Sequence, residues 1–302
     1  MYIRVPVPID HTLGESASLI EGGLIGSLTG LGKAPQLPNL SAWAPLIQFR
    51  PPRDIQQNIK SRGKVFKWYF LQIETHGIGP INLDYYPVEV SQLPLLGGVR
   101  CTPEQFLKHI RLNINNFLDP TLTRFNPYDQ SEAVKWASPN PLGAVLRLDF
   151  RDQSVNVDDG SVVVADFQPN RWIVSTIWNE SDWAHPLCGN REWGYFSTTP
   201  GTYIYYTRGA DRIANSQMMI HNLTPRQRSI AGKFILLGKN LVYDGQRKYW
   251  TGFQQRIRHF VNDRIQSGKA RVLPPSDTRY DWAQVADQYH CPSNCPQTNW
   301  IP

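Results

Sequence analysis

Long apolar runs are missing from this 302-residue sequence: no stretch of about 18 consecutive apolar residues occurs, so we expect no transmembrane helix. The N-terminus, which reads MYIRVPVPID, also lacks the charged start, apolar run and cleavage site of a secretory signal peptide. We therefore expect the protein to be made in the cytoplasm. Export by a route that needs no cleaved signal stays open.

Motifs that define several enzyme classes are absent as well. The sequence has no GxxxxGK(S/T), no GxGxxG opening a helix, no HExxH and no GxSxG. This excludes the P-loop, dinucleotide-binding, zinc-peptidase and nucleophile-elbow classes, and we expect no cofactor. No internal repeat and no heptad pattern occurs, which excludes solenoids and coiled coils.

Cysteine is scarce, with four residues in the chain. An even count permits two disulfides, but free thiols are the ordinary state in a cytoplasm. His290, Cys291 and Cys295 offer three soft metal ligands near the C-terminus. A zinc site usually needs a second ligand pair at regular spacing, and Cys101 and Cys188 are distant in sequence. We therefore expect free thiols or a disulfide in this segment rather than a metal site.

Positive charge is concentrated in one region. The net charge of the chain is +6, and residues 206–271 hold 13 Lys/Arg against 3 Asp, so the remainder is slightly acidic. Such a region favours an anionic partner, which could be nucleic acid, a lipid surface or an acidic protein. Aromatic residues stand among the basic residues of this region, and such a combination is typical of grooves that bind single-stranded nucleic acid. A solvated basic helix face is the competing interpretation, and we favour it.

Proline is abundant, with 24 residues, which argues against an all-helical fold. Residues 1–62, rich in proline and glycine, read as an irregular arm. We expect a core domain over 63–273 and an irregular tail over 274–302. Strands are predicted at 63–75 and 81–90, the second confined by Pro87 to a sheet edge or a bulge.

Two helices and five further strands are predicted in the core. Thr102 stands at an N-cap position before Pro103 and Glu104, and predicts a helix that runs to about residue 118. A second amphipathic helix is predicted over 244–268. Asp158-Asp159-Gly160 reads as a hairpin turn, and Gly209 as a point of unusual backbone angles. Five runs with period-two alternation predict an antiparallel meander: AVLRLDF, SVVVADF, RWIVSTIW, REWGYF and TYIYYTR.

This element order predicts an α+β fold in which an antiparallel meander sheet packs on a long C-terminal amphipathic helix. Over residues 64–268 the order resembles the helix-grip (START-like) fold. The resemblance implies a cavity between sheet and helix that takes an apolar ligand, and some members of that fold are enzymes. The aromatic candidates for the cavity or core are Trp68, Phe70, Trp172, Trp193, Phe253 and Phe260, with Tyr205 as a further ligand contact.

The segment around His185 holds the candidate catalytic residues. A histidine and Cys188 three residues apart could form a thiolate nucleophile. A structured turn between two strands is the simpler interpretation, because catalytic partners are usually distant in sequence. If this is a hydrolase, His185, Glu192 and Asp211 are its candidate catalytic residues.

Three arginines near the same hairpin are candidate anion ligands. Arg191, Arg208 and Arg212 would bind a phosphate or carboxylate through planar, bidentate contacts if they converged. Glu192 and Asp211 nearly balance them, so internal ion pairs are the alternative that we favour. The register of the strands decides between the two.

The motif HPxxGxRxWGY, followed by YTRGxDR, is similar to a segment of uncharacterised bacterial proteins, some of them secreted or toxin-associated. The match covers about 30 of the 302 residues, from His185 to Arg212. It implies a bacterial exported or effector-associated protein and implies no chemistry.

Three functions remain open at this point. We favour a protein that binds an apolar or amphipathic ligand, or a partner surface, and we lean against an enzyme. The alternatives are a toxin-type hydrolase at His185 and an assembly subunit whose arm, residues 1–62, wraps a neighbour in an oligomer.

Overall fold

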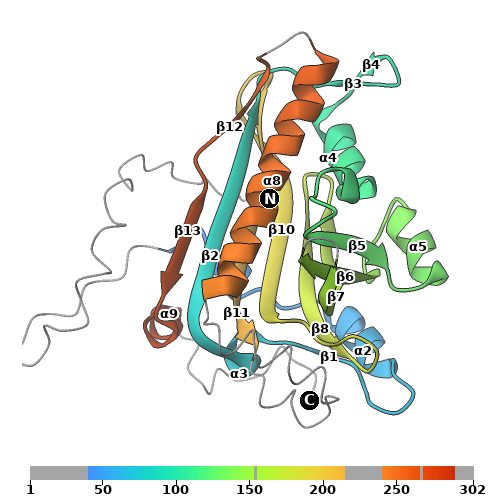
Figure 1. The fold of residues 1–302 in the computed structure, drawn as a ribbon, viewed down its shortest axis with the longest axis vertical. Coiled ribbons are helices and arrows are strands. Elements are labelled where there is room, and N and C mark those ends of the chain that lie inside the picture. Colours follow the sequence, from blue (N-terminus) through green and yellow to red (C-terminus); the bar gives the residue numbers. More distant parts are fainter. Residues whose placement is uncertain (1–39, 153–154, 215–239, 266–267, 290–302) are drawn as a thin grey trace, which may run out of the picture.

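The computed structural model describes residues 40–152, 155–214, 240–265 and 268–289. These residues form a long antiparallel sheet with helices on both faces (Figure 1). The strand order is β12-β2-β11-β10-β8-β7-β6-β5, and β1, β9 and β13 pair beside this path. Helix α8, Asn240–Arg264, lies along one face of the sheet. The predicted α+β class, a meander sheet packed on a long C-terminal helix, is confirmed.

The strands belong to two sheets, because β3 and β4 form a separate hairpin. In chain order the strands are β1 (Tyr69–Phe70), β2 (Gly77–Val90), β3 (Leu95–Leu96), β4 (Val99–Arg100), β5 (Thr123–Pro127), β6 (Val145–Asp152), β7 (Val155–Gln168), β8 (Arg171–Asn179), β9 (Trp183–Ala184), β10 (Leu187–Thr199), β11 (Thr202–Ala214), β12 (Ala270–Val272) and β13 (Ser276–Tyr280).

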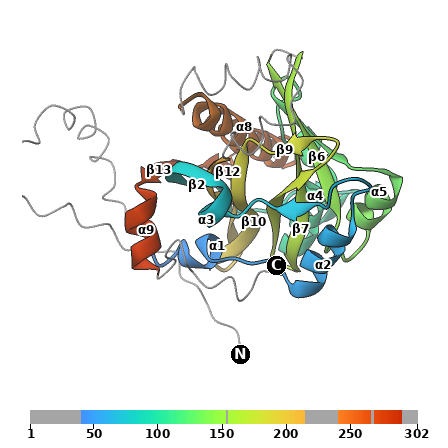
Figure 2. The same ribbon diagram turned by 90° about the horizontal axis from the view of Figure 1, so that it is seen from below.

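Helices cover both faces of the large sheet, as the view from below shows (Figure 2). We call the face under α4 and α8 the inner face, and the face under α1, α2, α3 and α9 the outer face. Besides α8, the helices are α1 (Ala44–Ile47), α2 (Arg53–Ser61), α3 (Ile73–His76), α4 (Pro103–Leu112), the 3-10 helix η2 (Ile114–Asn116), α5 (Gln130–Ala137) and α9 (Trp282–Gln288).

The five predicted meander runs lie in β6, β7, β8, β10 and β11, so the meander is confirmed. The predicted turn at Asp158-Asp159-Gly160 is wrong, because these residues pair with β6 inside β7. The strand predicted over 63–75 is reduced to β1, which is followed by α3. Alternation alone does not show where a strand finds a partner.

Strand β2 runs inside the sheet, although we expected Pro87 to confine it to an edge or a bulge. One neighbour is β11; on the other side β12 pairs as far as Val88, and β13 begins to pair at Tyr85. Pro87 therefore faces the gap between β12 and β13, where its missing N–H removes no ladder hydrogen bond. Its carbonyl oxygen accepts from Gln254 of α8 at 2.7 Å.

Helix α4 begins as predicted, with a capping box at Thr102. The Thr102 side chain accepts from the backbone N–H of Gln105, and the Gln105 side chain accepts from the backbone N–H of Thr102. The helix ends at Leu112 rather than near residue 118, because the Asn113 side chain donates to the carbonyl oxygen of His109 at 2.9 Å. The 3-10 helix η2 then continues the predicted apolar face.

The inner core consists largely of aromatic side chains between the sheet and α8. Trp172 and Trp193 stack with ring centres 5.2 Å apart, and Trp250 meets Trp193 edge-on at 5.6 Å. Phe253 and Ile257 continue the buried stripe of α8 at 1% and 0% exposure. Each such side chain contributes about 1.5–3 kcal/mol by burial. The predicted apolar stripe of the second helix is confirmed.

The described parts of the predicted arm and tail, residues 40–62 and 274–289, contain regular structure, whereas we predicted irregular segments. Ile55 and Ile59 of α2, four residues apart, are buried against the outer face. In the expected tail, β13 pairs with β2, and Asp281 caps α9 by accepting from the backbone N–H of Gln284. Short helices that bury one apolar side carry too little periodicity to be recognised in a proline-rich sequence. No observation tests the predicted domain boundaries.

Candidate functional site

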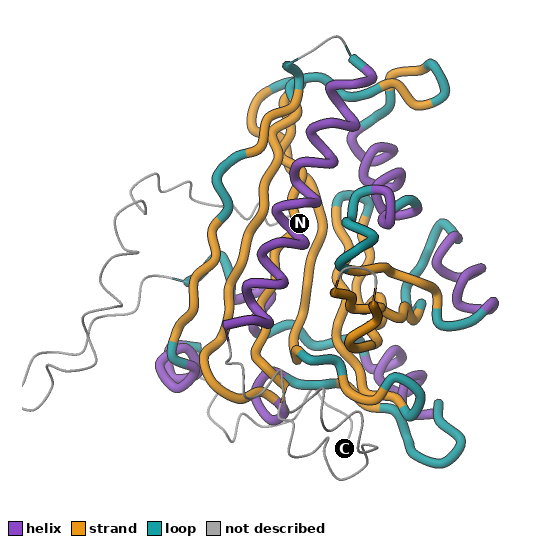
Figure 3. Tube along the Cα trace, in the orientation of Figure 1, coloured by secondary structure: helices purple, strands orange, loops and turns teal. Residues whose placement is uncertain are grey.

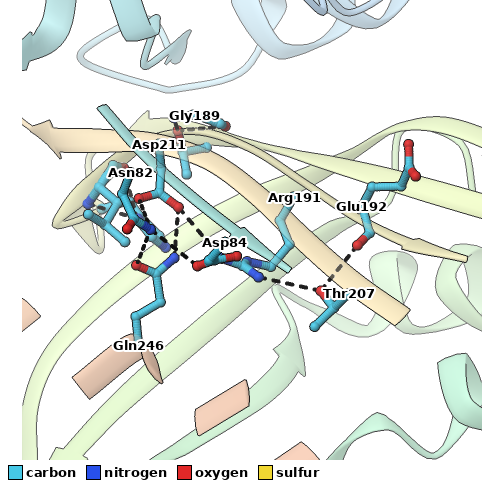
Figure 4. Close-up of polar contacts among 11 residues, drawn as sticks. Asn82, Asp84, Gly189, Arg191, Glu192, Thr207, Asp211 and Gln246 are labelled. Atoms are coloured by element: carbon cyan, nitrogen blue, oxygen red, sulfur yellow. Dashed lines mark hydrogen bonds and ion pairs between the residues drawn. The ribbon is translucent and has the colours of Figure 1, made fainter. Parts of the chain in front are cut away.

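A buried polar cluster lies under α8 on the inner face (Figure 4). Its centre is Arg191 of β10, whose Nη2 lies 2.7 Å from Asp84 Oδ2 and 3.6 Å from Asp211 Oδ2. Asp84 belongs to β2 and Asp211 to β11, so three neighbouring strands contribute. Gln246 of α8 donates to Asp211 at 2.7 Å, and the Arg191 guanidinium lies 4.5 Å from the ring centre of Trp250. The cluster therefore joins α8 to the sheet.

Gly209 makes room for this guanidinium. It stands opposite Arg191 in the β10-β11 ladder, and a Cβ at this position would lie 2.2 Å from Arg191 Nη2. The predicted unusual backbone angles at Gly209 are wrong, because its φ is not positive. The glycine is needed for space rather than for backbone freedom.

The cluster holds two carboxylates and one guanidinium. Burial raises the pKa of Asp211 to about 7, and the neighbouring Asp84 carboxylate adds to the increase, while Arg191 opposes it. Asn82 donates from Nδ2 to Asp84 Oδ2 at 3.2 Å. Asp211 therefore gains or loses its proton near neutral pH.

A second polar cluster lies on the outer face around Glu192, which is 1% exposed. Tyr206 donates its hydroxyl to Glu192 Oε1 at 2.5 Å, and Arg208 Nε lies 3.1 Å from the same oxygen. Arg171 reaches the other carboxylate oxygen at 3.3 Å. Arg208 also donates to the carbonyl oxygen of Ala42, so the cluster fixes the chain just before α1.

The three candidate arginines do not converge on one anion. Arg191 lies on the inner face, whereas Arg208 and Arg212 lie on the outer face. Arg212 donates to the carbonyl oxygens of Gly79 and Ile73, and its guanidinium lies 4.7 Å from the ring centre of Trp282. A shared anion clamp is therefore wrong, and internal pairing accounts for Arg191 and Arg208.

His185 is buried in the turn that precedes β10. Its Nδ1 accepts from the backbone N–H of Leu187 at 3.1 Å, and its ring meets Phe150 edge-on. Burial lowers the pKa of His185 to about 4, so the imidazole is neutral at pH 7 and is a weak base. Asp182, which precedes it, accepts from the Ser161 hydroxyl at 2.6 Å. This is the structured turn that we favoured.

Cys188 forms no dyad with His185. Its thiol donates to the carbonyl oxygen of Arg212 at 3.4 Å, and burial raises its pKa to about 12. A thiol with such a pKa does not supply a thiolate at neutral pH. Glu192 and Asp211, the other two catalytic candidates, lie on opposite faces of the sheet, so the three candidates are not brought together.

Most aromatic candidates are packed into the inner core, whereas Trp68 and Phe70 are buried on the outer face against α2. Trp172, Trp193, Tyr205 and Phe253 are at most 2% exposed, and the Tyr205 hydroxyl donates to the carbonyl oxygen of Pro103 at 2.9 Å. The hollow beside Trp193 and Phe253, under α4 and α8, has no room for a water molecule. In this part of the sheet–helix interior, the stacked Trp172 and Trp193 rings and the edge-on Trp250 ring occupy the space under α8.

A recess of about 350 Å³ lies outside this core, between α4 and the β3-β4 hairpin. The hairpin turns at Gly97 and Gly98, whose positive φ values of 60° and 82° fit a two-residue turn. This site was not predicted from the sequence; the available signal was Gly-Gly between Leu95-Leu96 and Val99-Arg100, just before a capped helix. The lining residues are Leu96, Val99, Arg100, Cys101, Gln105, Lys108, His109, Leu112 and Asn113.

Groups of three or more histidine, cysteine or acidic side chains placed to hold a metal do not occur in the described part of the chain. The candidate ligands His290, Cys291 and Cys295 lie outside the described residues, as does 215–239 of the basic region. The described helices include none with the length and hydropathy to span a membrane.

No protein-family model and no curated protein matches the sequence. Among solved structures, a conserved protein from Geobacillus kaustophilus is similar with a TM-score of 0.35 and 8% identity, over 60% of this chain and 95% of that chain. The di-domain ARO/CYC StfQ from the steffimycin biosynthetic pathway is similar with a TM-score of 0.34 and 12% identity, over 62% of this chain and 53% of that chain. A START superfamily protein from Mycobacterium smegmatis is similar with a TM-score of 0.30 and 11% identity, over 58% of this chain and 99% of that chain. These similarities carry no activity over to this chain.

The resemblance of the His185–Arg212 segment to secreted or toxin-associated bacterial proteins is not tested by these comparisons. Bacterial origin, export and an effector role therefore stay predictions from the sequence.

Proposed function

We propose that this protein binds an anionic amphiphile, a molecule with an apolar chain and an acidic head group, in the recess between α4 and the β3-β4 hairpin. The observation that carries the proposal is the composition of this recess. Leu96, Val99 and Leu112 supply an apolar wall, and Arg100 and Lys108 supply positive charge beside it. A volume of about 350 Å³ lies within the usual range for small-molecule sites.

Exposure of the apolar wall supports this choice. Val99 is 71% exposed and Leu112 is 38% exposed, so a bound chain would remove apolar surface from water. Arg100 also donates to the carbonyl oxygen of Leu93 at 2.6 Å, which holds its guanidinium at the rim. Burial and the nearby Arg264 lower the pKa of His109, which disfavours its charged form.

The filled interior favours the recess over the sheet–helix cavity that the helix-grip resemblance implied. A ligand between α8 and the sheet would have to displace the Trp172–Trp193 stack or the Arg191 cluster. Large-to-small changes in such cores cost about 3–5 kcal/mol, and displacing these side chains would be comparably unfavourable. A ligand in the recess displaces only solvent.

Laurate, used below its critical micelle concentration, tests the proposal by isothermal titration calorimetry. We expect saturable binding of one equivalent to the wild-type protein. Val99→Asp places a carboxylate in the apolar wall and adds negative charge next to Arg100, and should weaken binding at least about tenfold. Lys108→Glu should also weaken laurate binding, because it replaces a positive charge of the recess with a negative one.

Val134→Asp is the matched control, because Val134 of α5 is 65% exposed and lies outside the recess. It should bind laurate like the wild-type protein. Equal affinities for the wild type and Val99→Asp would contradict the proposal, and so would an equal loss in the control.

A further inference from the structure

The loop between α2 and β1 exposes two neighbouring apolar side chains. Val65 is 78% exposed and Phe66 is 53% exposed, and Lys64 and Lys67 on either side are exposed as well. The loop projects at the lower right of the molecule (Figure 3). We call residues 64–67 the tip.

Hydrogen bonds to the Glu180 side chain fix the backbone conformation of the tip. Glu180 accepts hydrogen bonds from three successive backbone N–H groups, those of Lys64, Val65 and Phe66, at 2.9, 3.1 and 3.1 Å. Gly63 has a φ of 87°, and a Cβ there would lie 1.9 Å from the carbonyl oxygen of Phe66. The tip is therefore a built feature of the surface. The Phe66 ring meets Trp178 of β8 edge-on, with ring centres 6.3 Å apart, and both apolar side chains of the tip stay largely exposed.

The tip carries two lysines that form no ion pair, and the Glu180 carboxylate lies beside it. Neither Lys64 nor Lys67 lies within ion-pair distance of a carboxylate among the residues that the structure describes. Glu180 accepts the backbone hydrogen bonds as a carboxylate, and Lys64 is among the groups that lower its pKa, so the two lysines and Glu180 together leave the tip with a positive charge. Glu132 of α5 pairs with Arg62 at 2.7 Å. The order along the tip is cation, apolar, apolar, cation.

We propose that the tip binds an anionic lipid bilayer, with Val65 and Phe66 entering the boundary between head groups and acyl chains. Lys64 and Lys67 then contact the head groups, since lysine stems can lie along apolar surface while the ammonium group stays in water. This contact is peripheral and independent of the amphiphile recess.

The shape of the tip favours a bilayer over a protein partner. Two projecting side chains on a convex loop bury little area, whereas a stable protein interface usually buries about 1,200–2,000 Å². A fluid lipid surface needs no preformed pocket for these side chains, and it supplies apolar depth and negative charge together.

Vesicle co-sedimentation tests the apolar part. We expect the wild-type protein to bind phosphatidylcholine vesicles that contain phosphatidylserine, and to bind pure phosphatidylcholine weakly. The double variant V65S/F66S leaves the charge unchanged and should weaken binding at least about 30-fold. Val134→Ser, which removes another exposed valine on α5 outside both the tip and the recess, should bind like the wild type.

A charge-matched pair of variants tests the lysines, because a chain of net charge +6 adheres to anionic vesicles without any specific site. K64Q/K67Q should lose about fivefold in affinity per lysine near the surface. K248Q/K269Q removes the same charge at two other exposed lysines and should lose much less.

Phe66→Trp provides a direct readout of depth. Its added tryptophan emission should increase and shift to the blue with anionic vesicles, and lipids brominated on the acyl chain should quench it. Full vesicle binding by V65S/F66S, or an equal loss in Val134→Ser, would overturn the proposal. If the wild type ignores vesicles while Phe66→Trp responds to a purified protein partner, the tip is a protein-docking site and the proposal is wrong.

Discussion

Replacing Arg191 with leucine should lower the free energy of unfolding by about 3–5 kcal/mol at pH 7, as measured by urea denaturation. The change leaves Asp84 and Asp211 buried with no cation, because Arg191 Nη2 is the group that lies 2.7 and 3.6 Å from them. It also removes the guanidinium from the Trp250 ring. Removing one partner of a buried charge cluster costs more than the cluster itself contributes, since the remaining charges lose their compensation.

Arg247→Leu is the matched control for this variant. Arg247 of α8 is also near a carboxylate, Asp277, at 3.7 Å, but its side chain is 59% exposed. Solvent screens such a pair, so the change should stay within about 0.5 kcal/mol. Similar losses for the two leucine variants would show that Arg191 is not the centre of a desolvated cluster.

Replacing Asp211 with asparagine should remove a pH dependence of stability. The pKa of Asp211 is raised in the folded protein to about 7, from an ordinary value of 3.8. A carboxyl group whose folded pKa is raised stabilises the fold fully below about pH 4, and this contribution is lost as the pH rises to 7. The loss is about 1.4 kcal/mol per pH unit, so it amounts to about 4 kcal/mol. Asparagine keeps an acceptor for Gln246 and carries no charge.

Urea denaturation of both proteins from pH 4.5 to 8 measures this effect. The stability of D211N relative to the wild type should rise with pH up to about 7 and then stay constant. Asp129→Asn is the control: the Ser131 hydroxyl and backbone N–H groups lower the pKa of Asp129, so its difference from the wild type should not change over this range. A pH-independent difference for D211N would contradict a raised pKa at Asp211.

Much of the sheet could be predicted because its strands carry local signals. β6, β7, β8, β10 and β11 alternate apolar and polar residues, are joined by short turns and pair in sequence order. The start of α4 was readable from Thr102, Pro103 and Glu104 for the same reason. Strand β2 finds its partners far along the chain, and β13 carries little hydrophobic patterning, so their places followed only from the structure.

The polar clusters could not be predicted, because register decides on which face a side chain lies. Arg191 and Arg208 are opposite-face neighbours in the β10-β11 hairpin, whose ladder shifts between Ser197 and Thr199. A shift of one residue would have exchanged the two faces. Asp84, the main partner of Arg191, is 107 residues away in sequence. Composition showed that the charges nearly balance, but it did not show which charges meet.

Site-resolved photo-cross-linking with a laurate analogue that carries a diazirine on its chain tests the central claim most directly. If the amphiphile binds in the exterior recess, the label should be found on the hairpin and α4, in residues 95–112, and should be lost in Val99→Asp. Labelling of β10 or α8 at Trp193 or Phe253 would contradict the account. It would show that the aromatic interior opens to admit the ligand between sheet and helix.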